Sequence, residues 1–199
     1  MSLHAHAHAL LATWSAPDPE QEKLRRAYLD HLDRYSDAMW RSCLPGHLTA
    51  SAAVMTASGR RTVLTLHRKL GKWLQVGGHC DEDDPSLQAA ALREATEESG
   101  IADLRLLPEP VRLDRHAVPC GGGSWHLDVQ FAAVAPDGAA LTRDDAESVD
   151  LGWFDIDELP HPSDEACQAL VRAAATAVAT MDGAQRCAPS PSAADRSRS

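Results

Sequence analysis

The chain has no long hydrophobic run and no targeting pattern at its N-terminus. Its apolar stretches are too short to cross a bilayer, which takes about 20 consecutive apolar residues. The first residues also lack the charged start and apolar core of a secretory signal. These absences argue against a membrane protein and against secretion, so we expect a soluble cytoplasmic protein.

Cysteine is also sparse. The chain has five cysteines, an odd number, and none of them stand in a CxxC spacing. Disulfide frameworks use even numbers of cysteines, so we expect no such framework here. No internal repeat is present, and 199 residues suit one domain with additions.

Positive charge is in short supply as well. Lysine and arginine total 19 against 29 aspartates and glutamates, which gives a net charge of −10. A nucleic-acid-binding surface needs a basic face for the phosphates, so we expect no polymeric nucleic acid partner. A nucleotide substrate stays compatible with this balance, because bound divalent ions can bridge an acidic protein and anionic phosphates.

What the chain does have is an acidic segment that follows a glycine pair. The segment from Gly78 to Ile101 predicts a strand end, an acidic loop and a helix. Asp84 is expected to cap the helix, with Pro85 at the first helical position. Gly100 is expected to end the helix in a left-handed conformation.

Three carboxylates share one side of this helix. At about 100° per residue, Glu94, Glu97 and Glu98 fall within roughly 100° of one another, at the margin of the apolar stripe. Such a cluster needs a cation, and a set of hard oxygen ligands favours Mg²⁺ or Mn²⁺. The alternative interpretation is a solvated acidic helix face.

The segment resembles the Nudix box, the signature of the Nudix hydrolases. That pattern runs Gly, five residues, Glu, seven residues, Arg-Glu-apolar-x-Glu-Glu-x-Gly-apolar. Gly78 opens it here, and the nine residues from Arg93 to Ile101 match its second half position by position. There are two departures: Asp84 stands where the family usually has glutamate, and eight residues separate it from Arg93.

The resemblance implies a fold and a set of site residues. The implied fold is an α/β/α sandwich around a mixed sheet. The implied metal ligands are Glu97, Glu98, the Gly78 carbonyl and Glu94, with Mg²⁺ or Mn²⁺ as the cofactor. Glu94 either binds metal or takes a proton from water, Glu98 belongs to the catalytic set, and Arg93 orients a box glutamate. A plain i, i+4 ion pair with Glu97 is the alternative for Arg93.

The pattern of the remaining sequence predicts the elements around the box. Helices are expected over 19–43 and 163–181. Strands are expected near 47–56, 62–67, 73–76, 104–107, 111–118, 126–134 and 150–154. The predicted division is an N-terminal helical extension at 1–45, the Nudix domain at 46–182 and a disordered tail at 183–199.

The N-terminal extension has two parts. From Met1 to Ala9, three histidines alternate with alanine, which favours a mobile terminus over a weak metal chelate. The amphipathic helix that follows is expected to pack on the domain or on a second subunit, which leaves a homodimer open.

Residues outside the box supply candidates for substrate binding. Glu147 lies in an acidic loop, and His126 stands on a predicted strand. Trp73 could stack on a base, with a structural aromatic as the alternative. His116, Cys120 and His126 also form a weak zinc pattern without an evident fourth ligand.

The sequence does not identify the substrate. The proline about fifteen residues beyond the box that marks many ADP-ribose enzymes is absent, and both tyrosines lie near the N-terminus. We expect a metal-dependent hydrolase that cleaves a diphosphate bond in a nucleoside diphosphate linked to another moiety. The alternatives are a Nudix-fold nucleotide-binding or regulatory module with little turnover and, last, an isoprenoid diphosphate isomerase.

Overall fold

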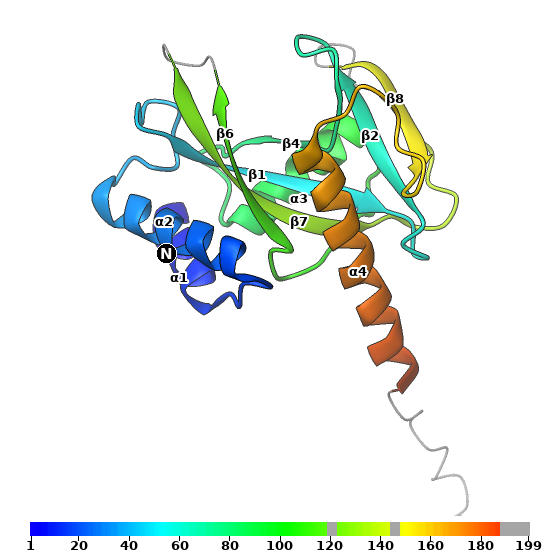
Figure 1. Ribbon diagram of the computed structural model, residues 1–199, viewed down its shortest axis with the longest axis horizontal. Helices are drawn as coiled ribbons and strands as arrows, with labels where there is room; N and C mark the ends of the chain where they lie inside the picture. Colours follow the sequence, from blue (N-terminus) through cyan, green and yellow to red (C-terminus); the bar gives the residue numbers. More distant parts are fainter. Residues whose placement is uncertain (119–122, 144–147, 188–199) are drawn as a thin grey trace, which may run out of the picture.

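A branched mixed sheet forms the centre of the molecule (Figure 1). The computed structural model of the chain describes residues 1–118, 123–143 and 148–187. Strand β1 (His47–Met55) pairs antiparallel with β2 (Arg61–His67) and β4 (Val76–His79), and parallel with β7 (Ser124–Val134). The outer strands are β3 (Trp73–Leu74) and β8 (Ser148–Asp155) on β2, and β5 (Arg105–Leu106) and β6 (Arg112–Val118) on β7. All the strands expected from the sequence are therefore present.

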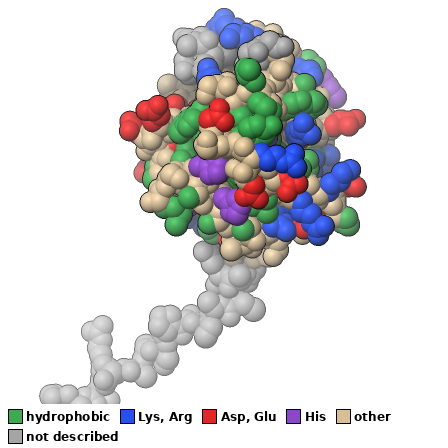
Figure 2. Space-filling model, turned by 90° about the vertical axis from the view of Figure 1, so that its left-hand side faces the viewer, with side chains coloured by type: hydrophobic (Ala, Val, Ile, Leu, Met, Phe, Trp, Pro, Cys, Tyr) green, Lys and Arg blue, Asp and Glu red, His purple; other side chains and the backbone are tan. Residues whose placement is uncertain are grey.

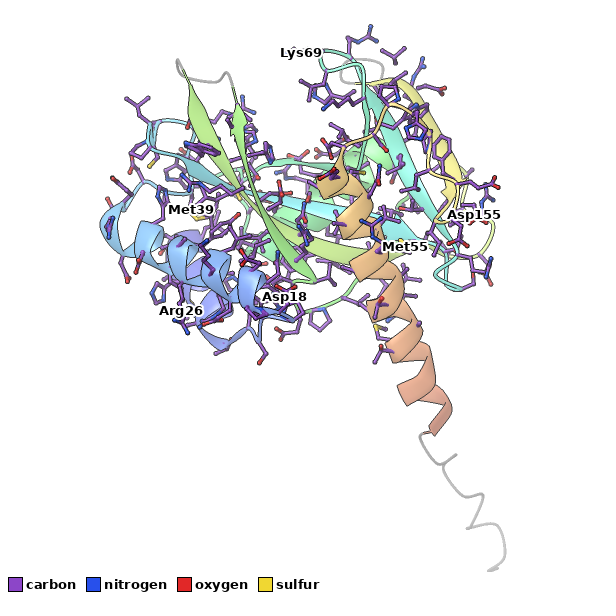
Figure 3. The ribbon with its side chains drawn as sticks, in the orientation of Figure 1. Asp18, Arg26, Met39, Met55, Lys69 and Asp155 are labelled. Atoms are coloured by element: carbon purple, nitrogen blue, oxygen red, sulfur yellow. The ribbon has the colours of Figure 1, made fainter. Side chains whose placement is uncertain are left out.

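Helices cover the two faces of this sheet. Because side chains alternate along a strand, β1 sends Leu48 and Ala50 to one face and Ala53 and Met55 to the other. The first pair packs in one core cluster with α3 (Leu87–Ser99), and Met55 packs in a second cluster with α4 (Glu165–Cys187) (Figure 3). The α/β sandwich expected from the sequence is confirmed.

The first residues of the chain form a helix, so the expectation of a mobile terminus is wrong. Helix α1 (Leu3–Thr13) buries Leu3, Ala7 and Leu11. These three apolar residues recur every four positions, whereas the histidines alternate with alanine. The four-residue spacing places the apolar side chains on one face of a helix, which packs on the core. The His4 Nε2 atom also lies 3.0 Å from the carbonyl oxygen of Leu32.

Helix α2 (Pro19–Arg34) is shorter than expected. The sequence predicted a helix to residue 43, but the chain turns after Tyr35. Ala38 and Met39 are buried within these turns, which explains why the apolar pattern continues past the helix. Helices α1 and α2 contribute Leu11, Tyr28 and Leu32 to the same core cluster as α3.

Helix α4 runs longer than expected and ends at Cys187 instead of near Met181. The predicted tail therefore begins within a helix, and residues 188–199 lie outside the described part. Among the helices described, none is long and apolar enough to cross a membrane. The face in Figure 2 shows acidic and basic side chains interspersed, without a continuous basic patch among its described residues.

Candidate active site

The loop before α3 does not cap the helix in the way that the sequence predicted. The N-cap residue is Ser86, whose side chain accepts a hydrogen bond from the Ala89 N–H at 3.0 Å. The Asp84 carboxylate instead accepts from the Asp81 N–H at 2.8 Å and pairs with Arg93. At the other end Gly100 has a φ of 71°, so the predicted left-handed cap is confirmed.

Arg93 lies at the centre of the carboxylate cluster. Its Nε and Nη2 atoms donate to the two oxygens of Asp84 at 3.2 and 2.9 Å. Its Nη1 atom donates to Glu94 at 3.0 Å and to Glu97 at 3.2 Å, and Nη2 also donates to the carbonyl of His79 at 3.0 Å. The hydrogen bonds to Asp84 raise the pKa of Arg93. Arg93 therefore forms the i, i+4 pair with Glu97 and also hydrogen-bonds Glu94.

Two glycines of β4 bring the backbone against these glutamates. The Gly77 N–H donates to Glu98 Oε1 at 2.9 Å, and Glu98 is buried. At Gly78, an added Cβ would lie 2.7–2.8 Å from the Glu94 carboxylate. The absence of a side chain at Gly78 therefore lets the carboxylate approach the strand backbone.

This arrangement fits a hard divalent ion. Glu94, Glu97 and Glu98 come from one side of α3, and the Gly78 backbone lies beside Glu94. Carboxylate and carbonyl oxygens are the ligands that Mg²⁺ and Mn²⁺ prefer. The positive charge of Arg93 is shared among several carboxylates, so negative charge remains for a cation.

A buried carboxylate lies on the sheet beside the box. Asp128 on β7 accepts hydrogen bonds from Thr49 at 3.0 Å, Ser51 at 2.6 Å and Gln130 at 3.0 Å. Burial raises the pKa of Asp128 despite these donors. The sequence pairs His126 and Asp128 two residues apart on a strand, and the structure places both on the same face of β7.

Three histidines gather on that face, and the sequence interpretation had proposed only His126 among them. His47, His79 and His126 each offer a ring nitrogen, and these nitrogens all lie within 4.8 Å of one another. Burial lowers the pKa of His79 to about 4 and that of His126 to about 3, so both rings are neutral at pH 7. His47 could have been found only from the register of its strand against the neighbouring strands, and the sequence alone does not supply that register.

The other candidates from the sequence lie in different surroundings. Trp73 packs edge-on against Phe154, with ring centroids 4.7 Å apart, in an apolar cluster with residues of α4. His116 lies beside His126 with its Nδ1 atom 2.8 Å from Asp114. Glu147 and Cys120 lie outside the described residues.

Comparisons with known proteins give one family match and several solved structures of similar fold. The family model described as NUDIX domain matches residues 46–174. MutT NUDIX hydrolase from Burkholderia pseudomallei is 23% identical with a TM-score of 0.51, and the alignment covers 64% of this chain and 96% of that chain. The NUDIX domain of Shewanella oneidensis NrtR, solved with ADP ribose, is 22% identical with a TM-score of 0.56, over 75% of this chain and 97% of that chain.

A third structure is the dihydroneopterin triphosphate pyrophosphohydrolase of E. coli. It is 16% identical with a TM-score of 0.54, over 63% of this chain and 92% of that chain. No curated protein matches the chain. At these identities the likeness to the solved structures shows a common fold, and the family match covers the box and all the described strands of the sheet.

Proposed function

This chain belongs to the NUDIX domain family, and from that premise we propose that it is a metal-dependent pyrophosphohydrolase. The proposed substrate is a small molecule in which a nucleoside diphosphate is linked to another moiety. The reaction is attack of water on one phosphorus atom, with cleavage of the phosphoanhydride bond and release of two phosphorylated products. MutT and the E. coli pyrophosphohydrolase named above share the fold, which supports this class of reaction.

The proposed site consists of the box residues. Gly78, Glu94, Glu97 and Glu98 would hold Mg²⁺ or Mn²⁺, the carbonyl oxygen of Gly78 included. When bound, such an ion neutralises phosphate charge and lowers the pKa of water. Glu94 or Glu98 would accept the proton from the attacking water.

The chain's own residues position these carboxylates. Arg93 hydrogen-bonds both Glu94 and the buried Asp84. Asp84 thus fixes the guanidinium, and the guanidinium in turn fixes the Glu94 carboxylate. The Gly77 N–H holds Glu98 in the same way, at 2.9 Å. The observation that supports the proposal best is the fixed position of the box glutamates: Arg93 hydrogen-bonds Glu94 and Glu97, and the β4 backbone hydrogen-bonds Glu98.

A hydrolysis screen tests the proposal. The full-length chain is incubated with dinucleotides, nucleotide sugars, nucleoside triphosphates and non-nucleotide diphosphates, with Mg²⁺, with Mn²⁺ and with chelator. We expect turnover of at least one nucleotide-linked diphosphate that requires metal. Glu98→Gln removes one negative charge with little change of shape and should lower kcat by about 100-fold or more.

The matched control is Glu82→Gln. Glu82 lies in the same acidic loop with an exposed side chain, so its neutralisation should leave kcat near the wild-type value. Turnover without metal, or unchanged turnover in Glu98→Gln, would contradict the mechanism. Tight binding of a nucleotide with no hydrolysis across the panel would instead favour the binding module.

A further inference from the structure

The three histidines described above come from three different strands. His47 on β1 is the register partner of His126 on β7, and His79 on β4 is the register partner of Thr49. The ring centroids are 4.8 Å apart for His47 and His126, 5.0 Å for His47 and His79, and 4.9 Å for His79 and His126. The sheet itself therefore fixes the cluster.

The cluster leaves buried ring nitrogens without partners. His47 has no exposed surface, and neither of its ring nitrogens has a hydrogen-bond partner. The Nε2 atoms of His79 and His126 are also buried and unpartnered. Each unsatisfied buried polar atom costs about 1–3 kcal/mol, so three such histidines together require an explanation. A shared ligand that accepts lone pairs from all three rings provides one.

The chemistry of three clustered imidazole rings points to a particular class of ligand. Imidazole nitrogen suits Zn²⁺, Cu²⁺, Ni²⁺ and Fe²⁺, whereas Mg²⁺ and Ca²⁺ prefer oxygen. The cluster therefore differs in kind from the carboxylate cluster of the box. The histidine cluster and the carboxylate cluster are neighbours, because His79 directly follows Gly78 in the chain. The His79 carbonyl also accepts a hydrogen bond from Arg93 at 3.0 Å.

We propose that His47, His79 and His126 form a second metal site, which binds one Zn²⁺-class ion through three imidazole nitrogens. A fourth position is left for water or substrate, as in sites with three protein ligands. The site goes beyond the proposed hydrolase function, because it uses none of the box glutamates.

Metal binding would draw the rings together. Three nitrogens at 2.0–2.1 Å from one tetrahedral ion stand about 3.4 Å apart, so the nitrogens, now within 4.8 Å of one another, need to approach by at most about 1.4 Å. Rotation of the rings supplies this movement. The Nη2 atom of Arg41 lies 2.9 Å from His79 Nδ1. If Nε2 of His79 binds the metal, Nδ1 carries the ring proton, and the exposed Arg41 side chain can then turn into solvent.

Metal titration of the full-length chain tests the proposal. The protein is stripped with chelator and titrated with Co²⁺, whose visible absorption reports a four-coordinate, nitrogen-rich site. We expect one Co²⁺ per chain, displaced by Zn²⁺ and retained in excess Mg²⁺. Zn²⁺ should also raise the melting temperature, since it binds the folded chain. His126→Gln and His79→Gln should each weaken binding by more than about 100-fold.

Two controls separate this site from others. His8→Gln removes a half-buried histidine of α1, where His4 and His8 could chelate metal one helical turn apart, and it should leave Co²⁺ binding unchanged. Glu98→Gln should also leave Co²⁺ binding unchanged, even if hydrolysis is lost. Far-ultraviolet circular dichroism verifies that each variant is folded, and the two histidine variants lie on different strands, so one misfolded variant does not prevent the test.

Two results would overturn the proposal. One is a stripped wild-type chain that binds neither Co²⁺ nor Zn²⁺. The other is Co²⁺ binding that stays at wild-type strength in folded His126→Gln or in folded His79→Gln. Neither result depends on hydrolysis, so failure of this site is distinguishable from failure of the proposed function.

Discussion

Gly78→Ala is the substitution that best tests how the strand backbone and the glutamates work together. A Cβ added at this position would lie 2.7 Å from Glu94 Oε1 and 2.8 Å from its Oε2. Ordinary contacts are 3.4–4 Å, so the Glu94 carboxylate must retreat by more than half an ångström. A displacement of this size at a catalytic group costs about 10- to 100-fold in rate. We therefore expect kcat to fall by that factor.

Stability should change little in the same variant. The group displaced is the end of a flexible side chain, and Gly78 does not have a positive φ. Alanine also restricts the unfolded chain, which favours folding by about 0.4–1 kcal/mol. The free energy of unfolding should thus stay within about 1 kcal/mol of wild type, which corresponds to a shift of about 2–4 °C in Tm. Steady-state kinetics and thermal unfolding on the same preparation check both parts.

The neighbouring glycine is the control for this prediction. Gly77 has a φ of 148°, and a Cβ there would lie 2.3 Å from Ser51 Cβ and 2.4 Å from its Cα. The backbone of β1 cannot give way as a side chain does, so Gly77→Ala should lose about 2–5 kcal/mol of stability. If Gly78→Ala keeps wild-type kcat, or if Gly77→Ala is as stable as wild type, the assigned roles of these glycines are refuted.

Two further predictions concern the N-terminal helices. Leu11 has no exposed surface, so Leu11→Ala should lower the free energy of urea unfolding by about 2–5 kcal/mol, and an unchanged value would mean that α1 is not part of the folded core. Burial lowers the pKa of His31 below its ordinary value of 6.5, and its Nε2 atom lies 2.9 Å from the Gly46 carbonyl. Between the pKa of His31 in the folded chain and 6.5, the unfolded chain binds more protons at this residue. The stabilisation that neutral His31 gives the folded chain is therefore complete above pH 6.5 and is lost as the pH falls through that window. Urea unfolding across that range should therefore show a smaller pH dependence in His31→Gln than in wild type; equal slopes would contradict this.

Local signals in the sequence were sufficient for much of the box. Gly100 ends α3 as predicted, because a left-handed residue after a helix almost requires glycine. The strands were also predicted correctly, since alternation of side chains is visible in the sequence itself. The same signals failed at Asp84, which was predicted as the helix cap but pairs with Arg93 across the loop. That pairing is a tertiary contact, and it outweighs a local capping preference.

The sequence alone determined the family resemblance, the acidic helix and the placement of three glutamates on one side of it, because helical geometry follows from residue spacing. Only the tertiary structure decided which strands lie side by side. The parallel pairing of β1 with β7 sets His47 against His126, and the antiparallel pairing of β1 with β4 sets His79 beside them. Strand register depends on contacts between residues that are far apart in the chain, so no local pattern around His47 could reveal the histidine cluster.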